Sequence, residues 1–509
     1  MIASKNPDVK VTIVDLSEKR IQAWQTDDLP IHEPNLLAIV QSARDQLDDS
    51  RPLNLFFSTD IDAAILEADL IFVSVNTPTK TFGHGKGRQS ELSFVESAIR
   101  RIAAVAENDK IIVEKSTVPV RTAESMREIL LANCKPGVRF EILSNPEFLA
   151  EGTAVKNLLF PDRILVGSLN TTGGMRAAAA LVDIYSSWVP REKIITTNLW
   201  SSELAKLAAN VLLAQRISSI NALSAICEVT GADVSEISYA CGLDSRIGPK
   251  MLSASVGFGG SCLKKDILSL SYIAESLHLP EVASYWRSIN EINEYQKDRF
   301  TRRIISCLHH SLMHKKIAIL GFAFKKDTGD TRESAAISIV CDLVAEGASI
   351  GIYDPRASEE NIWFELEAAC EDPKLMREQV TIFSTVYEAC VDAHAAVIVT
   401  EWDYFSNKAS RDISHRVDKL RTREELALPF SPPQTPCVEE QEPTKAGGLA
   451  TSNTRPRMNW ESVAGVMKKP MYVFDGRDIV DAGNLQELGF RVEGIGRPGT
   501  GKKVLVDLE

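Results

Sequence analysis

Short apolar runs alternate with longer amphipathic stretches in this chain, and this alternation limits the possible folds more than any other feature. In the first third of the sequence, the apolar runs have the length and composition of buried strands, and the stretches between them have the pattern of helices. The runs lie at 11–14, 70–75, 111–113 and 140–143. Such alternation predicts a doubly wound α/β sheet, whose ligands gather at the carboxyl ends of the strands.

Polar residues follow the runs at the expected strand ends, namely Asp15, Asn76 and Thr77, Ser116 and Thr117, and Asn145, Pro146 and Glu147. An acid in the position of Asp15 can bond the ribose hydroxyls of NAD. In dinucleotide-binding folds, such an acid lies about 20 residues after the glycine-rich turn that binds the pyrophosphate. Counting back that far from Asp15 passes Met1, so we expect the N-terminal unit to lack its first strand and glycine turn. A solvated acid is the alternative interpretation of Asp15.

A glycine-rich loop at 257–262 ends in a cysteine, Cys262, which is followed closely by Lys265 and Asp266. The thiolate is the nucleophilic form of cysteine, and a neighbouring cation or a helix N-terminus stabilises it. Glycines let a ligand or another main chain approach closely. The loop therefore predicts a nucleophilic Cys262, and an ordinary turn with a small buried apolar cysteine is the alternative.

A long helix rich in Ala and Leu is predicted from Leu199 to about Cys227, with Gly231 near its end. Lys206 and Asn210 are four residues apart, so both side chains should project from one face. They could form a solvated polar stripe. Because their neighbours are mostly apolar, we expect instead a stripe buried in a cleft, where a desolvated lysine is available for proton or charge chemistry.

A second α/β unit begins with the strand at 315–321 and continues with the strand at 350–354. The turn between them carries Lys325, Lys326 and Arg332, and a diphosphate ligand requires such cations. The proline-rich stretch at 428–460 predicts a disordered insertion, and a further strand ends at Asp475-Gly-Arg477. A diphosphate-binding unit is therefore expected in this half of the chain.

The composition excludes several classes of protein. A net charge of −12 makes nucleic acid a poor partner, and no apolar segment long enough for a signal peptide or a membrane span is evident. The nine cysteines show no metal-like pairs, so we expect reduced thiols in a cytoplasmic protein, with no structural disulfide and no zinc or other metal.

Taken together, segments distributed along most of the chain closely resemble the UDP-glucose/GDP-mannose dehydrogenase family. They are Ser74-Val-Asn-Thr-Pro-Thr79, Glu114-Lys-Ser-Thr-Val-Pro119, Ser144-Asn-Pro-Glu-Phe-Leu-Ala-Glu-Gly152, Lys206-Leu-Ala-Ala-Asn210, Gly257-Phe-Gly-Gly-Ser-Cys262 and Gly321-Phe-Ala-Phe-Lys325. The resemblance implies an enzyme that oxidises UDP-glucose to UDP-glucuronate in a four-electron reaction with NAD as cofactor.

The resemblance also implies three domains. They are an NAD-binding Rossmann-like domain at 1–195, truncated at its start, a central helical domain at 196–300, and a UDP-binding Rossmann-like domain at 312–509 that contains the insertion. The long central helix joins the two Rossmann-like domains and implies a dimer, and relatives assemble further into hexamers.

The catalytic roles follow by resemblance. Cys262 would attack a C6 aldehyde to form a thiohemiacetal, which a second oxidation converts to a thioester. Lys206 and Asn210 would stabilise negative charge on the C6 oxygen. Asp266 and Thr117 would position the hydrolytic water, with Glu147 as the acid–base group.

The binding roles also follow by resemblance. The UDP-sugar would contact Phe148, Leu149, Glu151, Arg246, Phe258, Gly259, Phe324, Lys325 and Arg477. Arg246 would reach the sugar site of a neighbouring subunit. The cofactor would contact Asp15, Arg20, Asn76, Thr77, Ser116, Thr117, Glu151, Lys265 and Arg332.

Two alternatives stay open at this point. The chain could be a catalytically inactive, truncated subunit that binds UDP-sugar and co-assembles with intact enzyme, because the resemblance lacks the main-chain cradle for the NAD pyrophosphate. The same chemistry could also act on another sugar nucleotide, such as UDP-N-acetylmannosamine or GDP-mannose.

Overall fold

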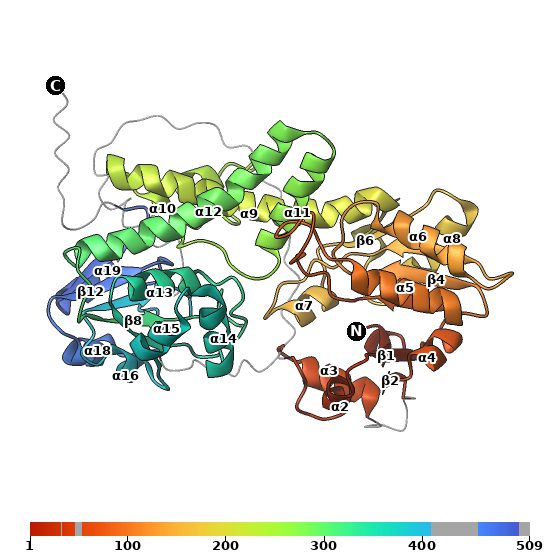
Figure 1. Cartoon of the computed structure of the whole chain (residues 1–509), viewed down its shortest axis with the longest axis horizontal. Coiled ribbons are helices and arrows are strands. Elements are labelled where there is room, and N and C mark those ends of the chain that lie inside the picture. Colours follow the sequence, from red (N-terminus) through yellow and green to blue (C-terminus); the bar gives the residue numbers. More distant parts are fainter. Residues whose placement is uncertain (32, 46–52, 409–456, 498–509) are drawn as a thin grey trace, which may run out of the picture.

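The structure is a computed structural model that describes residues 1–31, 33–45, 53–408 and 457–497. Most of the predicted insertion at 428–460 lies outside these residues. Figure 1 shows two α/β lobes, one from the first part of the chain (red to orange) and one from the last (teal to blue), with long helices (yellow to green) running along both.

The N-terminal lobe contains two separate parallel or mostly parallel sheets. Strands β1 (Val11–Val14) and β2 (Leu55–Ser58) form a parallel pair. The second sheet has the order β3-β4-β5-β6-β7. Its strands are β3 (Leu70–Val73), β4 (Lys110–Glu114), β5 (Phe140–Ser144), β6 (Ile164–Ser168) and β7 (Ile194–Asn198). Only β5 and β6 pair antiparallel among these described strands, so the predicted strands and their parallel arrangement are confirmed.

Helices cover these sheets. They are α1 (Ile2–Lys5), α2 (Glu18–Trp24), α3 (Leu36–Arg44), α4 (Ile61–Glu67), α5 (Ser93–Val105), α6 (Thr122–Asn133), α7 (Ala154–Leu159) and α8 (Thr172–Ser186), with a 3₁₀ turn at Arg191–Lys193. The core of the larger sheet is well sealed, because Ile112 and Val113 of β4 are fully buried between α5, α6 and α8.

A gap in pairing separates β1 from β3. Among the described residues, β1 pairs only with β2, and β3 pairs only with β4. In a doubly wound sheet, a further strand would lie between two edge strands such as β1 and β3. Ile13 and Phe56 of the small sheet are both 39% exposed. Within the described parts of the chain, the small sheet and the larger sheet are therefore not joined by a strand.

Four long or medium helices form the middle of the molecule, namely α9 (Leu199–Thr230), α10 (Val234–Gly242), α11 (Leu263–Ser276) and α12 (Pro280–Cys307). The side chain of Asn198 accepts a hydrogen bond from the Ser201 amide and so caps the start of α9. Gly231 ends it, with a positive φ of 85° that favours glycine. The predicted long connecting helix is therefore confirmed.

The C-terminal lobe contains a parallel sheet in the order β10-β9-β8-β11-β12-β13. Its strands are β8 (Lys316–Leu320), β9 (Ser349–Tyr353), β10 (Val380–Ile382), β11 (Ala395–Ile398), β12 (Met471–Asp475) and β13 (Phe490–Gly494). Its helices are α13 (Ala335–Ala345), α14 (Glu359–Ala369), α15 (Pro373–Gln379), α16 (Val386–Cys390), α18 (Trp460–Val466) and α19 (Ala482–Glu487). The reversal of strand order beside β8 is the arrangement expected of a second Rossmann-like domain.

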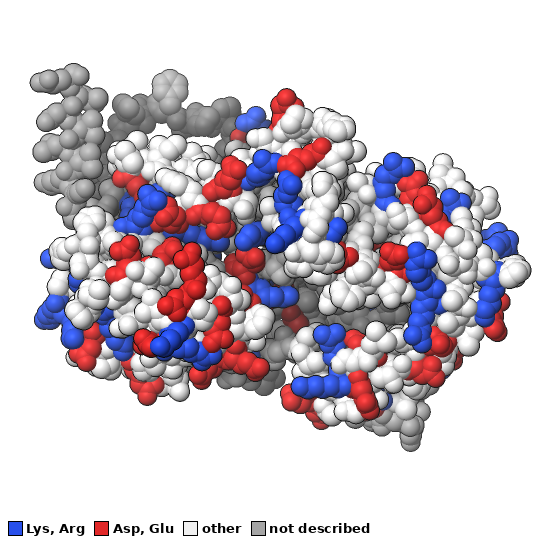
Figure 2. Space-filling view, viewed as in Figure 1, with Lys and Arg blue, Asp and Glu red and all other residues white. Residues whose placement is uncertain are grey.

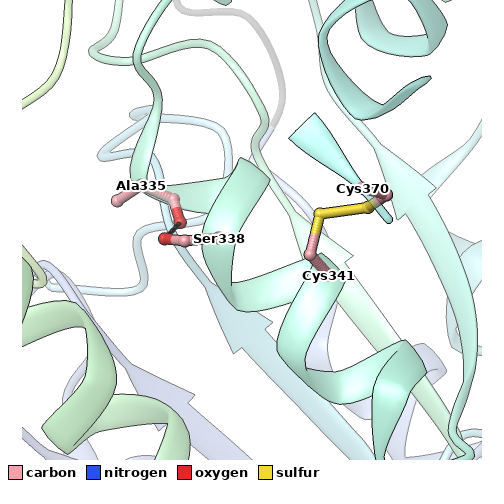
Figure 3. Close-up of a disulfide and its surroundings, with 4 residues drawn as sticks. All are labelled: Ala335, Ser338, Cys341 and Cys370. Atoms are coloured by element: carbon pink, nitrogen blue, oxygen red, sulfur yellow. Dashed lines mark hydrogen bonds between the residues drawn. A yellow bond between two sulfur atoms is a disulfide. The ribbon is translucent and has the colours of Figure 1, made fainter. Parts of the chain in front are cut away.

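The expectation of no structural disulfide is wrong. Cys341 on α13 is bonded to Cys370, which directly follows α14, with 6.0 Å between the Cα atoms (Figure 3). The two cysteines are 29 residues apart and come within bonding range because α13 packs against α14. Cysteine spacing alone could not indicate this pairing.

The surface carries both charge signs. Figure 2 shows basic and acidic side chains interspersed over the visible face, and a hollow between the two lobes. Among the described helices, none is both long enough and apolar enough to cross a membrane.

Candidate active site

Cys262 lies on the surface at the start of α11. It is the N-cap residue of that helix, and its Sγ is 3.8 Å from Ser261 Oγ. The side chain is exposed, so the alternative of a small buried apolar cysteine is wrong. The positive end of the helix dipole favours negative charge at this position.

The glycine-rich loop before Cys262 is held from two sides. The Phe258 amide donates to Asn293 Oδ1 of α12 at 2.9 Å, and the Gly260 amide donates to the Arg332 carbonyl at 3.0 Å. A Cβ at Gly260 would lie 2.9 Å from the Phe324 ring, and its φ is +85°. The loop therefore needs glycine there, and it joins the central helices to the C-terminal lobe.

Lys206 and Asn210 project from one face of α9, as predicted, and both meet acidic partners. Lys206 Nζ lies 3.0 Å from Glu147 Oε1, and Asn210 Nδ2 donates to Asp266 Oδ2 at 2.7 Å. Lys206 is only 4% exposed. The solvated polar stripe is therefore wrong, and the predicted buried position of this lysine is confirmed.

Asp266 lies on the first turn of α11, where its amide donates to the Cys262 carbonyl at 3.0 Å. Burial raises the pKa of Asp266, against the opposing pull of Lys265, whose Nζ lies 3.4 Å from Asp266 Oδ1. The cation that was expected beside the Cys262 thiol is thus paired with the neighbouring carboxylate. These contacts gather a thiol, an amide and two carboxyl–lysine pairs around the start of α11.

The strand-end loops after β3 and β4 are bonded to each other. Ser116 Oγ donates to the Val75 carbonyl at 2.7 Å, and Thr77 Oγ1 donates to the Thr117 carbonyl at 2.8 Å. The structure thus brings together the segments that contain Asn76 and three other predicted cofactor contacts. They form one edge of the larger sheet, at the carboxyl ends of its strands.

Glu151 links the two lobes. Lys325 Nζ donates to its carbonyl at 2.8 Å, Thr328 Oγ1 donates to its Oε2 at 3.2 Å, and Arg332 lies 3.6 Å from its Oε1. Burial, with the nearby carboxylate of Asp330, raises the pKa of Glu151. This group of predicted binding residues therefore spans the junction between α7 and the turn after β8.

Phe148 and Leu149 follow Glu147 and line the same side of the site. The Leu149 amide donates to Glu147 Oε2 at 2.6 Å, and the Phe148 ring lies 5.5 Å from Lys206 Nζ. Arg163 covers the same ring at 3.9 Å. The backbone here is fixed by the carboxylate that precedes it.

Arg477 and Phe324 meet in the C-terminal lobe. Arg477 Nη2 donates to the Phe324 carbonyl at 3.2 Å, and its Nε lies 3.3 Å from Glu401. The Phe258–Gly259 segment packs on the same turn, because a Cβ at Gly259 would lie 2.9 Å from Phe324 Cβ. These predicted substrate contacts are therefore adjacent.

Two groups of predicted residues stand apart. Arg246 is exposed and held by Asp244, with 2.6 Å between Nη2 and Oδ2, and no other predicted site residue is bonded to it in the described parts. Asp15 and Arg20 pair at 3.2 Å at the carboxyl end of β1 in the smaller sheet.

The residues present fit NAD in part. Asp15 directly follows the parallel strand β1, the position at which a ribose-binding acid is expected. The loops after β3 and β4 offer hydroxyl and main-chain groups at the carboxyl ends of their strands. The described residues contribute no glycine turn between β1 and a helix. Asp15 and these loops could hold the adenosine and nicotinamide parts of NAD, and the pyrophosphate cradle is not among the described residues.

Sequence reasoning missed several residues that organise the site. Glu33 accepts hydrogen bonds from the Gly152 and Ala154 amides, at 2.6 and 3.1 Å, and thereby caps α7. Glu203 accepts from the Arg121 and Ala123 amides before and within α6. Lys115 directly follows Glu114, the buried last residue of β4. Two adjacent charged residues after an apolar run were the sequence signal that could have indicated this position.

Models of one family match the chain in three parts. They are the NAD binding domain of the UDP-glucose/GDP-mannose dehydrogenase family at residues 1–189, its central domain at 200–295 and its UDP binding domain at 318–423. The chain belongs to the UDP-glucose/GDP-mannose dehydrogenase family. Cys262, Lys206 and Asn210 thus fall in the family's central domain, and Glu147 falls in its NAD binding domain.

Family members of known name cover nearly the whole chain. The UDP-glucose 6-dehydrogenase of Drosophila melanogaster is 50% identical over 98% of this chain and 93% of its own length. That of Pongo abelii is 49% identical over 99% of this chain and 91% of its own length.

Solved structures share the fold. A UDP-glucose dehydrogenase from the archaeon Pyrobaculum islandicum is 28% identical, with a TM-score of 0.68 over 80% of this chain and 89% of that one. A UDP-D-ManNAc dehydrogenase from Pyrococcus horikoshii, at 22% identity, reaches a TM-score of 0.71 over 97% of this chain and 96% of that one.

Proposed function

We propose that this chain is an NAD-dependent dehydrogenase that oxidises the C6 alcohol of UDP-glucose to the carboxylate of UDP-glucuronate. The observation that carries the proposal is an exposed Cys262 at the start of α11, beside the Lys206–Glu147 and Asn210–Asp266 pairs. Identities of about half with UDP-glucose 6-dehydrogenases along the whole chain support the same substrate.

Cys262 supplies the nucleophile. Its sulfur adds to the C6 aldehyde and forms a thiohemiacetal, which holds the intermediate until the second oxidation gives a thioester. Water then cleaves the C–S bond, which releases the carboxylate and returns the thiol. The fixed glycine loop supports this role, because it keeps the sulfur at one position relative to α11.

Lys206 and Asn210 stabilise negative charge on the C6 oxygen. Both side chains project from one face of α9, and each is bonded to a carboxyl group, Glu147 for Lys206 and Asp266 for Asn210. They are therefore oriented before substrate binds. Glu147 acts as acid–base group beside Lys206, and Asp266 positions the hydrolytic water together with Thr117. Burial raises the pKa of Asp266, which makes this carboxyl a better proton acceptor than an exposed aspartate.

The acceptor for the hydrides from C6 would be supplied by NAD⁺. Its contacts would be Asp15, Arg20, Asn76, Thr77, Ser116, Thr117, Glu151, Lys265 and Arg332. The UDP-sugar would lie between the two lobes, against Phe148, Leu149, Glu151, Phe258, Gly259, Phe324, Lys325 and Arg477. The junction that Glu151 forms with Lys325 supports this position, because it adjoins both sets.

The chain acts in the cytoplasm as a homo-oligomer built on a dimer of α9, with hexamers as the larger assembly. Exposed apolar residues on α9 support a dimer. They are Leu204, Leu212, Leu223, Ile226 and Val229. At about 100° per residue these positions share about a third of the helix circumference. Arg246 would reach a neighbouring subunit with its exposed side chain, which is paired with Asp244 in the single chain.

A substrate panel tests the proposal. The purified chain should form NADH from UDP-glucose at a rate at least about tenfold above that from UDP-N-acetylmannosamine or GDP-mannose. A preference for either of the other sugars would contradict the proposed substrate. Binding of UDP-glucose without NADH formation would favour the inactive-subunit alternative, which no observation on the described residues favours at present.

A further inference from the structure

Asp354 directly follows β9, the second strand of the C-terminal lobe in chain order, and the proposed mechanism gives it no role. The first strand, β8, leads into a turn that starts with Gly321. In a dinucleotide-binding fold, a glycine turn follows the first strand, and an acid after the second strand bonds the ribose hydroxyls. The lobe therefore carries the residue pattern of a dinucleotide site, and the contacts of Asp354 decide whether this acid can bind a ribose.

The carboxylate of Asp354 is filled by donors from the protein itself. Its Oδ2 accepts from the amides of Phe322 and Ala323, at 2.6 and 2.9 Å, and from Trp402 Nε1 at 3.1 Å. Its Oδ1 accepts from the amides two and three residues further along the chain, both at 2.8 Å. A carboxylate offers about four lone-pair positions, so these donors leave no capacity for the hydroxyls of a ribose.

Asp15 also follows a parallel strand, and its carboxylate is more open. Its side chain is 33% exposed. In the described parts of the chain, its hydrogen-bond donors are the Ser17 amide, 2.8 Å from Oδ1, and Arg20, 3.2 Å from Oδ2. This carboxylate keeps acceptor positions for a ribose. The two strand-end acids therefore differ in what they can bind.

The donors on Asp354 Oδ2 include the start of the turn after β8. Phe322 and Ala323 are fully buried, and the Gly321 amide donates to the carbonyl at the end of β9 at 2.8 Å. The Ala323 carbonyl accepts from Thr400 Oγ1 at 2.5 Å. The turn is thus fixed up to Ala323 by β9, by its acid and by the segment after β11.

The next two residues of this turn, Phe324 and Lys325, are proposed contacts of the UDP-sugar. Lys325 Nζ donates to the Glu151 carbonyl at 2.8 Å, and the Phe324 carbonyl accepts from Arg477 Nη2 at 3.2 Å. The part of the turn that Asp354 holds therefore directly precedes the part that would face the substrate.

We propose that Asp354 is a positioning residue that fixes the turn carrying Phe324 and Lys325 for the UDP part of the substrate, and that it binds no nucleotide ribose. This inference rests on the proposed function, in which that turn contacts the UDP-sugar. A turn that is fixed before binding loses less conformational freedom when the ligand arrives. Loss of the carboxylate should therefore weaken UDP-sugar binding and spare the binding of NAD.

Binding without turnover tests the inference. The Kd of UDP-glucose is measured by isothermal titration calorimetry with the purified full chain and no NAD⁺. In Asp354→Asn, an amide NH₂ faces main-chain donors, so this Kd should rise at least about tenfold, while the Kd of NADH stays within about twofold. In the NADH assay, the KM of UDP-glucose should rise with its Kd, whereas kcat should stay within about threefold.

Asp372→Asn is the matched control, because Asp372 caps α15 of the same lobe through the Lys374 and Leu375 amides. The control variant loses a cap and a charge in the same lobe, as Asp354→Asn loses an anchor and a charge. It should leave the Kd of both ligands unchanged. A rise in the Kd of UDP-glucose in both variants would show a general effect on the lobe and overturn the positioning role.

Trp402→Phe is a second variant, which decides the question if Asp354→Asn does not fold. It removes one donor to Oδ2 and keeps a ring at this buried position, so the Kd of UDP-glucose should rise about threefold. Trp363→Phe is its control, because it removes a bond to Glu359 on α14 of the same lobe. UDP-glucose affinity equal to that of the unmodified chain in Trp402→Phe would overturn the inference.

The outcomes separate the two claims. Unchanged UDP-glucose affinity in folded Asp354→Asn would overturn the positioning role and leave the proposed function intact. Weaker NADH binding with unchanged UDP-glucose binding would also overturn it, and would assign Asp354 to a ribose. An unmodified chain that neither binds UDP-glucose nor forms NADH would contradict the proposed function, and the inference with it.

Discussion

Cys262 differs from the other free cysteines in its surroundings. Cys227 and Cys390 are buried, and burial raises the pKa of Cys390 to about 12, which keeps that thiol protonated and inert. Cys262 is exposed at a helix start, next to a loop that its glycines and Asn293 hold in place. Among the described free cysteines, only Cys262 is both exposed to solvent and located beside the residues of the proposed site.

Replacement of Cys262 by serine should lower the rate of UDP-glucuronate formation by about 100-fold or more, because a hydroxyl is a far weaker nucleophile for the aldehyde. The product is measured by ion-exchange chromatography. Cys241→Ser is the matched control, since Cys241 is also exposed but lies on α10. A Cys262→Ser enzyme that makes UDP-glucuronate at the normal rate would rule out the covalent route.

The sequence predicted the residues whose placement depends on local geometry. Lys206 and Asn210 share a helix face because their spacing matches the helical repeat, and Cys262 was marked by its own glycines. Lys115 and Glu203 could not be predicted in the same way. Their partners, Asn145 and the α6 amides, come from other elements and become neighbours only through packing.

At the scale of elements, the start of α6 depends on a side chain from another helix. Arg121 is the N-cap residue and makes no side-chain cap itself. The carboxylate of Glu203, on α9, accepts from the Arg121 amide at 2.6 Å and from the Ala123 amide at 2.7 Å. Burial raises the pKa of Glu203 to about 7, against the pull of these two amides.

This raised pKa predicts a stability change with pH. Between pH 4.5 and about 7, the folded protein keeps the Glu203 proton that the unfolded chain has lost, so stability falls as pH rises. The loss is about 3 kcal/mol over this window. Glu203→Gln should remove that part of the pH dependence in urea unfolding, and Glu124→Gln on the exposed side of α6 should not. The same slope in Glu203→Gln and the unmodified chain would contradict this account.

The Cys341–Cys370 bond joins α13 to the end of α14 and closes a loop of about 30 residues. Loss of such a cross-link costs about 3.6 kcal/mol in the chain-entropy account. The double variant Cys341→Ser/Cys370→Ser should therefore unfold at lower urea concentration than the oxidised chain. Added reductant should lower the midpoint of the unmodified chain and leave that of the variant unchanged. Equal midpoints for both oxidised proteins would show that the bond does not stabilise the lobe.

The elements themselves were partly predictable. Strands β1, β3, β4 and β5 were visible as apolar runs, and α9 was visible as a long Ala-rich and Leu-rich pattern. Strand β2 was not predicted. The antiparallel pairing of β6 with β5 and the disulfide were not predicted either, since both depend on which elements become neighbours.

At the scale of the molecule, α9 presents two different faces. One face carries Lys206 and Asn210 to the site, and another presents the exposed apolar residues from Leu204 to Val229. Exposed apolar residues gathered on one side of a helix support an interface there. Assembly and catalysis would therefore share one rigid element.

A charge placed on the apolar face should weaken the assembly. Ile226 is 58% exposed, and Ile226→Glu should shift the oligomer toward the monomer in size-exclusion chromatography with light scattering. Leu213→Glu is the control, because Leu213 lies on the opposite side of α9 and is 38% exposed. Identical masses for Ile226→Glu and the unmodified chain would contradict an interface at this face.

The most direct measurement is the amount of NADH formed for each UDP-glucose consumed by the purified chain. The proposed Cys262 route carries the sugar through both oxidations, so the account predicts two NADH for each sugar, with UDP-glucuronate as product. One NADH for each sugar, with the aldehyde released, would contradict the covalent route. Complete absence of NADH would contradict the proposed function itself.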